Sequence, residues 1–369
     1  MIFLTRYNTI GLLCFLTISL LLMYVNFLDH SHNTRLSGRQ NIINNSNIKL
    51  NDYATPKIAN YLSKYNNRWI EKMEKRYTQI NRRIEEVCEK SHFNYATTTP
   101  YEKKSFFRHF VLDTSHRLGF CNNHKVGSTT TMHYIEKFIN SSFLKKGIDI
   151  HDSIHKALQP SKDKIIESII NDTAIKVENT SFIYLFNRAM QQNRILTFSF
   201  VRHPHERLVS AYRDKILGGE GRCKKFLSFT FPEFINHVLD EYKYDTHIDN
   251  CNTHWRAFAS RCFYCNFKYN VIGTNMETLN EHYKYIILKQ KLENIIPLEK
   301  ISATFNRSGG KSKINKWNKG KQERNALTQK HIAVQEYFSH LSKGQIKAIH
   351  DLYRLDFELF DYDPEKYII

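Results

Sequence analysis

A loop at residues 121–131 carries the side chains with the clearest chemical use. Its sequence is CNNHKVGSTTT, and it follows an apolar stretch and leads into a segment of helical periodicity. A strand, a turn with lysine, glycine and hydroxyl groups, and then a helix form an arrangement that binds phosphate, because the N–H groups and the dipole at the helix start favour an anion. The triphosphate-binding loop G-x-x-x-x-G-K-[ST] has its lysine after the glycine, whereas Lys125 precedes Gly127. This order indicates a phosphate-bearing ligand of another kind, with an ordinary strand–helix turn as the alternative.

A second segment, residues 195–215, has the same pattern. The run ILTFSFV at 195–201 is short, apolar and β-prone, which predicts a buried strand, and residues 207–215 are helical in pattern. Arg202 therefore stands at the carboxyl end of a strand, where ligands bind in open α/β sheets, and its planar guanidinium suits a phosphate. Ser210, two turns along, can offer a hydroxyl group to the same anion. The alternative is a structural ion-pair network of Arg202, Glu206 and Arg213.

Strands that alternate with helices predict an α/β fold, here a phosphate-loop-like parallel sheet flanked by helices. We expect strand structure over 106–122 and helices from there to about residue 186, in a globular domain at 101–369. A stem at 29–100 precedes it, first as an asparagine-rich linker and then, from Ile58 to Val87, as an amphipathic helix with apolar residues three and four apart. We favour a helix packed on its own domain, because the spacing departs from a strict heptad; the alternative is a coiled coil that makes a homodimer through the stem.

The N-terminal region predicts a membrane anchor. Residues 7–28 contain no charged side chain and are long enough to span a bilayer. With Arg6 in the short segment before them, they predict a signal anchor with residues 1–6 cytoplasmic and the domain lumenal. A cleaved signal peptide is the alternative, but no A-x-A-like site follows. N-x-[ST] sequons, useful only in the secretory pathway, occur at Asn44, Asn140, Asn171, Asn179 and Asn306.

The formal charge of +18 predicts an acidic partner. Nucleic acid, an anionic membrane face and a polyanionic glycan all fit that charge, and a lumenal domain favours the glycan over nucleic acid. A basic run with three glycines predicts a mobile loop that closes over a nucleotide or grips an acidic glycan, with a solvated surface loop as the alternative. Its cations are Arg307, Lys311, Lys313, Lys316, Lys319, Lys321 and Arg324.

The loop at 121–131 and the segment at 195–215 together resemble the two cofactor signatures of the Golgi carbohydrate sulfotransferases, in the branch with chondroitin, dermatan and HNK-1 sulfotransferases. The signatures are P-K-V-x-[CS]-T and F-[VL]-R-x-P-[FH]-E-R-L-V-S-A-Y-R-D-K, and this chain reads HKVGST at 124–129 and FVRHPHERLVSAYRDK at 200–215. The resemblance covers roughly residues 100–365. It continues at His254-Trp255, at 262–265 (CFYC), at 269–273 (YNVIG), at 337–342 (YFSHLS) and at 353–362 (YRLDFELFDY).

The resemblance implies transfer of a sulfuryl group from 3′-phosphoadenosine 5′-phosphosulfate (PAPS) to a sugar hydroxyl, by a Golgi single-pass type II membrane protein. It implies that Arg202 and Ser210 bind the 3′-phosphate. The 5′-phosphosulfate is bound by residues 125–130, which are Lys125, Val126, Gly127, Ser128, Thr129 and Thr130. The family's proline before the lysine is His124 here, which puts the entry geometry of the loop in doubt.

The catalytic residues implied are Lys125, which stabilises charge on the departing phosphate oxygen, and a base near the acceptor hydroxyl. His151 lies roughly where related sulfotransferases carry a reactive histidine, and His254 matches a family histidine; Glu206 is a third candidate base. The acceptor implied is a chondroitin-like glycan, sulfated at O-4 of N-acetylgalactosamine. The alternatives are a non-catalytic relative that binds polyanionic glycans, favoured by His124 in place of proline, and a nucleotide-dependent kinase.

The cysteines bear on metal binding and on compartment. Six lie beyond the anchor, at 88, 121, 223, 251, 262 and 265, and an even number predicts disulfides in an oxidising compartment. Cys262-x-x-Cys265 is either half of a zinc site or, as we favour, a disulfide-linked pair. Sulfuryl transfer needs no metal, and we expect none.

Overall fold

The computed structural model describes residues 56–91, 100–139, 149–171, 182–218, 228–243, 252–301 and 333–368. The chain divides into two units, Met1–Asn67 and Arg68–Ile369, and the fold below is that of the second unit. The expected anchor, the asparagine-rich linker, every sequon except Asn171 and the basic run at 307–324 lie outside the described residues. Within the ranges given above, no helix is both long enough and apolar enough to cross a membrane.

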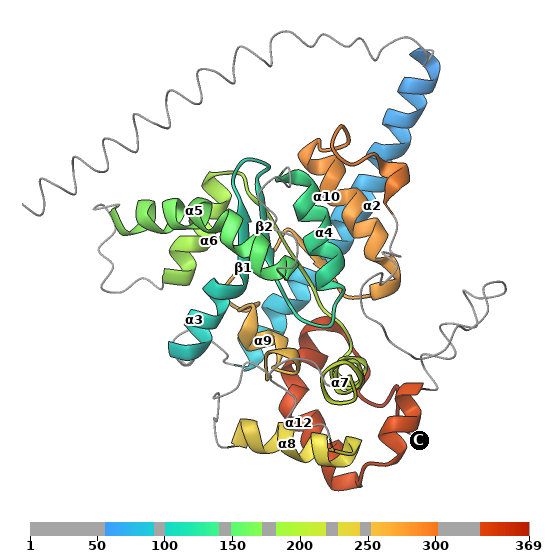
Figure 1. Cartoon of the computed structure of the whole chain (residues 1–369). Helices are drawn as coiled ribbons and strands as arrows, with labels where there is room; N and C mark the ends of the chain where they lie inside the picture. Colours follow the sequence, from blue (N-terminus) through green and yellow to red (C-terminus); the bar gives the residue numbers. More distant parts are fainter. Residues whose placement is uncertain are drawn as a thin grey trace, which may run out of the picture. The chain divides into compact units, whose positions relative to one another are not determined.

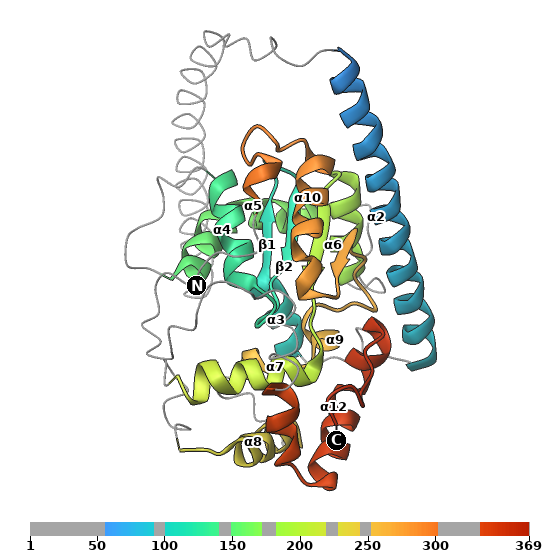
Figure 2. The same ribbon diagram turned by 90° about the vertical axis from the view of Figure 1, so that its right-hand side faces the viewer.

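Most elements are helices arranged around one small sheet (Figures 1 and 2). Residues 333–339 are also helical. The α-helices and strands, in chain order, are α2 (Pro56–Ser91), α3 (Pro100–His109), β1 (Phe110–Asp113), β2 (Leu118–Cys121), α4 (Ser128–Phe138), α5 (Ile150–Asn171), α6 (Phe182–Gln192), β3 (Leu196–Phe200), α7 (Pro204–Ala211), α8 (Phe231–Lys243), α9 (Phe258–Arg261), β4 (Val271–Gly273), α10 (Leu279–Gln290) and α12 (Lys343–Phe360). The π-helix η3 (Tyr212–Ile216) and the 3₁₀ turns η5 (Asn252–His254), η6 (Met276–Thr278) and η7 (Leu298–Lys300) complete the list.

The four-stranded sheet has the order β1-β2-β3-β4. β2, β3 and β4 are parallel, as expected, but β1 pairs antiparallel with β2. The expectation of a parallel sheet is therefore wrong for β1. Only residues 114–117 join β1 to β2, and so short a connection joins antiparallel neighbours, whereas parallel strands need a long crossover.

The expectation of strand structure at 106–122 needs a second correction, because residues 106–109 are the end of α3. Phe106 and Phe110 are both fully buried, with ring centroids 5.4 Å apart, although one lies in a helix and the other in a strand. A short apolar run in the sequence indicates that its residues are buried, but it does not show whether they form a helix or a strand.

Helices cover both faces of the sheet (Figures 1 and 2). On one face Phe120 stacks on Phe198, and Phe200 meets Tyr283 of α10, with ring centroids 4.8 and 5.4 Å apart. On the other face Phe110 meets Phe186 of α6 at 5.2 Å. Every residue of the four strands is buried, so both faces of the sheet are covered, and the polar Thr197 and Ser199 of β3 lie inside as well.

A helical layer packs below the sheet, around α7, α8 and α12 (Figure 1). α12 begins with a capping box, in which Ser342 Oγ accepts from the Gln345 N–H at 3.2 Å and Gln345 Oε1 accepts from the Ser342 N–H at 3.0 Å. The buried apolar core of this layer is Leu208, Val209, Ala211, Tyr212, Ile216, Phe231, Phe234, Ile235, Val238, Trp255, Val334, Phe338, Leu341, Ile349, Tyr353, Phe357 and Tyr367.

From Arg68 onward, α2 belongs to the same compact unit as the sheet. Met73, Tyr77 and Ile84 are buried in the main core, and Cys88 forms a disulfide with Cys265. This part of the helix packs on its own domain, the arrangement that its sequence spacing favours. The compact unit thus includes a segment that we had assigned to the stem.

The second disulfide joins Cys121 at the end of β2 to Cys262. The expected pairing of Cys262 with Cys265 is wrong, because Cys262 lies against β2 and Cys265 against α2, so each bonds to a different layer. The part of the chain that the structure describes holds no group of three His, Cys, Asp or Glu side chains that could bind a metal ion.

Candidate active site

The parallel pairing of β2 with β3 brings the two predicted phosphate-binding segments together. Cys121 and Ser199 are paired in the register, so the loops that follow the two strands leave the same edge of the sheet. Arg202 Nη1 donates a hydrogen bond to the carbonyl oxygen of Lys125 at 3.3 Å. Two segments 77 residues apart in sequence therefore form one site.

The loop before α4 has the backbone geometry of an anion cradle. Lys125 and Gly127 both have left-handed backbone conformations, with φ of 66° and 74°. A Cβ at residue 127 would lie 3.0 Å from Met276 Cε, so glycine is favoured by both conformation and space. Gly127 is the N-cap of α4 and has no side chain to accept from the first turn. The N–H groups of that turn, which have no acceptor within a helix, are thereby left for an anion.

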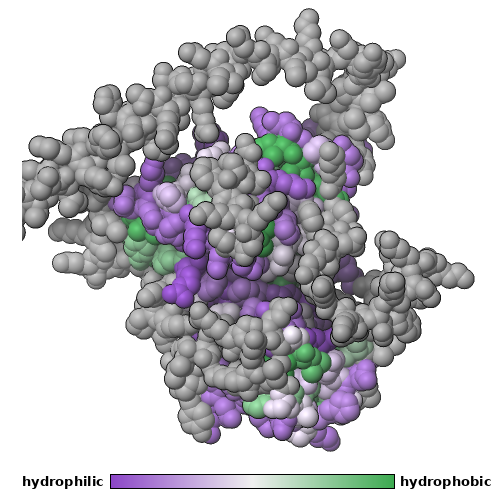
Figure 3. Space-filling model, in the orientation of Figure 1, coloured by the Kyte–Doolittle hydropathy of each residue, from purple (hydrophilic) through white to green (hydrophobic). Residues whose placement is uncertain are grey.

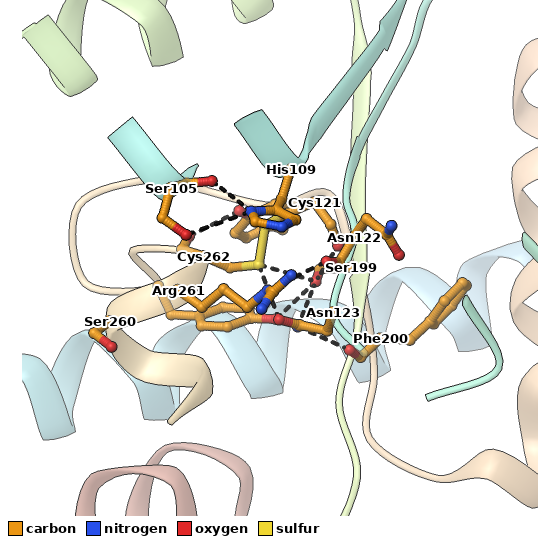
Figure 4. The surroundings of a disulfide bond; sticks show 12 residues. Ser105, His109, Cys121, Asn122, Asn123, Ser199, Phe200, Ser260, Arg261 and Cys262 are labelled. Carbon is orange, nitrogen blue, oxygen red and sulfur yellow. Dashed lines mark hydrogen bonds between the residues drawn. A yellow bond between two sulfur atoms is a disulfide. The ribbon is translucent and has the colours of Figure 1, made fainter. Parts of the chain in front are cut away.

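Buried amides and a disulfide fix the start of this loop to the sheet (Figure 4). Asn123 Nδ2 donates to the Phe200 carbonyl at 3.0 Å and to the Tyr264 hydroxyl at 2.9 Å. Arg261 bridges the loop to the segment that carries His254, because its Nε donates to the Asn122 carbonyl at 3.3 Å and its Nη1 to the Thr253 carbonyl at 2.8 Å. The loop and the His254 segment are thus held in a fixed relation.

Lys125 forms an ion pair with Asp214, and Lys215 Nζ lies 3.2 Å from the same oxygen, Asp214 Oδ2. Burial alone would raise the pKa of Asp214, but the charges and hydrogen bonds of the two lysines lower it to about 2. The carboxylate is therefore ionised across the physiological range. The sequence signature contained Asp214 and Lys215, but nothing in its spacing indicated which way the two side chains point.

Arg202 is paired with Glu206, as the structural alternative predicts, at 2.9 Å between Nε and Oε2. Tyr367 donates its hydroxyl hydrogen to Glu206 Oε1. Both carboxylate oxygens of Glu206 are therefore occupied, which weakens its case as a base. Arg213 is exposed. Ser210 lies in the last turn of α7 and is half-buried, and its role toward a phosphate stays a prediction.

Three histidine rings meet beside the loop. The His124 ring lies 4.6 Å from that of His254 and 6.2 Å from that of His151, between centroids. Both candidate bases thus lie next to the ring of His124, the residue that stands in place of the family's proline. Sequence reasoning treated His124 only as a departure from the signature and missed this contact.

His151 and His254 differ in their hydrogen bonds. His151 Nδ1 lies 3.1 Å from the side-chain amide nitrogen of Asn122, and its Nε2 lies 3.4 Å from Thr129 Oγ1. An amide can meet either histidine tautomer, because its nitrogen donates and its oxygen accepts. His254 Nδ1 is buried and has no hydrogen-bond partner among the residues that the structure describes. Such an unsatisfied nitrogen is costly in a folded protein and calls for a functional explanation.

Burial favours the neutral form of both rings. It lowers the pKa of His151, although Asp149 and Asp152 oppose the shift. For His254, burial is again the largest cause, and the charges of Lys125 and Lys215 add to it, so its pKa lies well below the usual value. A neutral imidazole can accept a proton, which is what a base in this site must do.

The segment after His254 is anchored by a buried arginine. Arg207 donates to the carbonyl oxygens of Trp255 and Arg256 at 3.0 and 2.6 Å and pairs with Asp356 at 3.9 Å. Asp356 accepts from the N–H groups of Phe258 and Ala259, each at 2.8 Å. This network connects α7, α9 and α12 and positions the backbone next to the candidate base.

The surface agrees with a polar ligand: Figure 3 shows a hydrophilic band across the middle of the face seen in Figure 1. A separate cavity of about 740 Å³ lies at the opposite ends of the strands, where it is lined by the starting residues of β3 and by parts of α2, α6 and α10. None of the predicted site residues lines that cavity. In a parallel sheet the carboxyl ends of the strands bind ligands, so we assign the active site to the Lys125 loop.

The chain is similar in sequence to known carbohydrate sulfotransferases. Carbohydrate sulfotransferase 10 of Xenopus laevis is 23% identical over 311 residues, which are 77% of this chain and 76% of that protein. The protein of the same name in Danio rerio is 24% identical over 321 residues (80% and 76%), and carbohydrate sulfotransferase 11 of Rattus norvegicus is 23% identical over 283 residues (71% and 69%). No solved structure matches the chain.

The match to a family model covers the site itself. The model described as "Sulfotransferase family" matches residues 108–363, a range that begins just before β1 and includes the Lys125 loop, Arg202 and all three histidines of the cluster. That range is well over half of the chain. The chain therefore belongs to the sulfotransferase family.

Proposed function

We propose that this protein transfers a sulfuryl group from PAPS to a hydroxyl group of a glycan. The observation that carries the proposal is the meeting of Lys125 and Arg202 at the carboxyl ends of two parallel strands, beside an uncapped helix start. The names of the relatives, carbohydrate sulfotransferases 10 and 11, support a carbohydrate acceptor. Within that class we propose a chondroitin-like acceptor, sulfated at O-4 of N-acetylgalactosamine.

The residues present fit the donor. Gly127 leaves the first-turn N–H groups of α4 for an anion, and Lys125 supplies a cationic side chain from the same loop. We assign residues 125–130 to the 5′-phosphosulfate and Arg202 with Ser210 to the 3′-phosphate. The guanidinium of Arg202 already touches the loop, which fits a nucleotide that bridges the two segments. When bound, the donor supplies an activated sulfuryl group.

The chain's own groups supply charge stabilisation and a base. The acceptor oxygen forms its bond to sulfur as the bond from sulfur to the phosphate oxygen breaks, and the electron pair of that bond stays on the phosphate. Lys125 stabilises the charge that develops there. A neutral histidine takes the hydroxyl proton, and His151 and His254 are both candidates.

The acid side of the pH–rate profile tests the histidine base. The working form is the neutral ring, and burial lowers the pKa of both candidates below the ordinary value of 6.5. We therefore expect kcat/KM, which reports the groups of the free enzyme, to stay level as the pH falls through 6.5 and to decline only at lower pH. A profile already half-reduced at pH 6.5 or above would contradict a buried histidine base. One of the variants His151→Gln and His254→Gln removes the base. That variant should lower kcat by about 10²- to 10⁴-fold, and its rate should no longer show the decline on the acid side of the profile.

Replacing Arg202 tests the 3′-phosphate site. Arg202→Ala should weaken binding of 3′-phosphoadenosine 5′-phosphate (PAP) by roughly 10- to 100-fold, because it removes charge-assisted hydrogen bonds to a phosphate. Isothermal titration calorimetry measures the dissociation constant. Arg213→Ala, which removes an exposed arginine nearby, is the matched control and should bind normally. Unchanged PAP affinity in Arg202→Ala would refute the assignment.

The activity itself is tested with ³⁵S-labelled PAPS and the purified full-length protein. Desulfated chondroitin, dermatan and glucuronylated acceptors would be compared, and disaccharide analysis would locate the label. Label at O-4 of N-acetylgalactosamine supports the proposed acceptor, and label at another position shows that a different hydroxyl group is sulfated. Salt-sensitive glycan binding without transfer would favour a non-catalytic relative, and ATP turnover would favour a kinase.

We also propose that the protein is a single-pass type II protein of the Golgi membrane with its catalytic domain in the lumen. The two disulfides support an oxidising compartment, because such bonds rarely persist in the cytosol. Protease protection in sealed microsomes, with an epitope tag at each end, tests the orientation. A protected C-terminal tag supports it, and an accessible one contradicts it.

A further inference from the structure

A π-helix next to the candidate site turns two further charged residues toward the Lys125 loop. η3 spans Tyr212–Ile216 and directly continues α7, and the Leu217 N–H bonds to the Tyr212 carbonyl at 3.0 Å. π-helical turns are rare and are found frequently at functional sites. This one is anchored by Tyr212 and Ile216, which are buried in the helical layer.

The charged residues between those anchors have different surroundings. Arg213 is exposed. Asp214 and Lys215 are partly buried, and the side chain of Lys215 retains only 19% of its exposure. The Asp214 carboxylate is shared, because Lys125 from the loop and Lys215 from the π-helix contact the same oxygen. A structural ion pair needs only one lysine, whereas here two ammonium groups from different segments converge on one point beside the anion cradle.

We propose that Lys215 is a second cation for the sulfuryl end of the donor and that Asp214 is a positioning residue that holds Lys125 and Lys215 together. This inference rests on the proposed function. With one carboxylate between two ammonium groups, this cluster has a net positive charge. An ammonium group has three N–H donors, so one carboxylate contact does not saturate it.

The charge of Lys215 also reaches the two candidate bases. Its charge lowers the pKa of both His151 and His254. Lys125 and Arg261 act on His254 in the same direction, and Asp214 opposes them. Lys215 therefore shares a carboxylate with the lysine of the donor loop and acts electrostatically on both candidate bases.

The test compares three substitutions on the same π-helix, Lys215→Met, Asp214→Asn and Arg213→Met, in the full-length protein. PAP binding by calorimetry is the first readout. Lys215→Met should weaken PAP by about fivefold or more, because a nearby positive charge is lost, and Asp214→Asn should tighten it, because a negative charge is lost. Arg213→Met should leave it unchanged. Opposite changes in PAP affinity at these two adjacent residues would indicate an electrostatic role, since a structural defect would weaken PAP binding in both variants.

Transfer kinetics are the second readout. Asp214→Asn should lower kcat although it binds PAP more tightly, because Lys125 and Lys215 lose the group that holds them, and Asp214→Glu should restore part of kcat. Thermal unfolding confirms that each variant is folded. Lys215→Met with the PAP affinity and kcat of the wild type overturns the role of Lys215, and Asp214→Asn with weakened PAP binding overturns that of Asp214. A wild-type protein that neither binds PAP nor transfers sulfate overturns the proposed function and this inference together.

Discussion

Lys125→Ala is expected to lower kcat by about 10²- to 10³-fold, the usual cost of removing one group that stabilises developing charge in a transition state. Lys125 precedes the first residue of α4 by three positions in the loop to which we assign the 5′-phosphosulfate, and no other side chain of the 125–130 loop carries a charge. Initial rates with labelled PAPS and a saturating glycan acceptor measure the effect. PAP affinity should fall much less than kcat, because the charge that Lys125 stabilises develops during the transfer.

Two controls make the Lys125 result specific. Lys125→Arg keeps the charge and should retain more activity than Lys125→Ala, although its planar group is not equivalent to an ammonium. Lys289→Ala removes a lysine on α10 that pairs with Glu74, at the opposite end of the strands, and should leave kcat unchanged. A Lys125→Ala enzyme with more than a tenth of wild-type kcat would show that the loop lysine does not stabilise the leaving group.

Arg207→Ala is expected to cost about 3–5 kcal/mol of the free energy of unfolding, because it leaves the buried carboxylate of Asp356 without its cation. Both side chains are almost fully buried, and Arg207 also stacks on the Phe258 ring at 3.9 Å. Chemical denaturation measures the loss. Burial raises the pKa of Asp356 and Arg207 opposes the rise. The penalty should therefore be largest at neutral pH and should shrink as the pH falls and the carboxylate becomes protonated.

A double variant separates the charge effect from the loss of packing. Arg207→Met combined with Asp356→Asn removes both charges, and we expect it to lose less stability than the sum of the two single variants. Strict additivity would mean that the two charges do not interact. Since Arg207 holds the carbonyl groups next to His254, the single variant should also lower kcat under conditions where it remains folded.

The sequence predicted the parts of the site that depend on chain order. Two strand–loop–helix units imply parallel neighbours, and the structure pairs β2 with β3 so that Lys125 and Arg202 meet. The apolar spacing of residues 58–87 likewise predicted a helix, and the structure has one over Pro56–Ser91. Both predictions rest on local periodicity and on a general rule about where loops leave a parallel sheet.

Contacts between segments that share no local pattern could not be predicted. The direction of β1 depends on a short turn, and the partners of Cys262 and Cys265 depend on which layer each cysteine faces. A π-helix leaves no periodic signature, because one extra residue in a turn changes the facing of the side chains without changing the composition. Asp214 therefore gave no sequence signal of its contact with Lys125.

The nested pattern of the two disulfides, with the 121–262 bond inside the loop closed by the 88–265 bond, has a consequence for biosynthesis. Each of them joins a cysteine made early, at 88 or 121, to one made about 140 or more residues later, at 262 or 265. As the chain leaves the ribosome, Cys88 and Cys121 are exposed to oxidation before their native partners exist, and Cys262 and Cys265 then emerge as close neighbours. These four cysteines allow three pairings, and the two wrong ones join either early with early and late with late, or 88 with 262. In the oxidising compartment proposed above, any wrong pairs formed before residue 265 is made must be reversed by disulfide exchange, so a disulfide isomerase is expected to raise the yield of correctly paired protein.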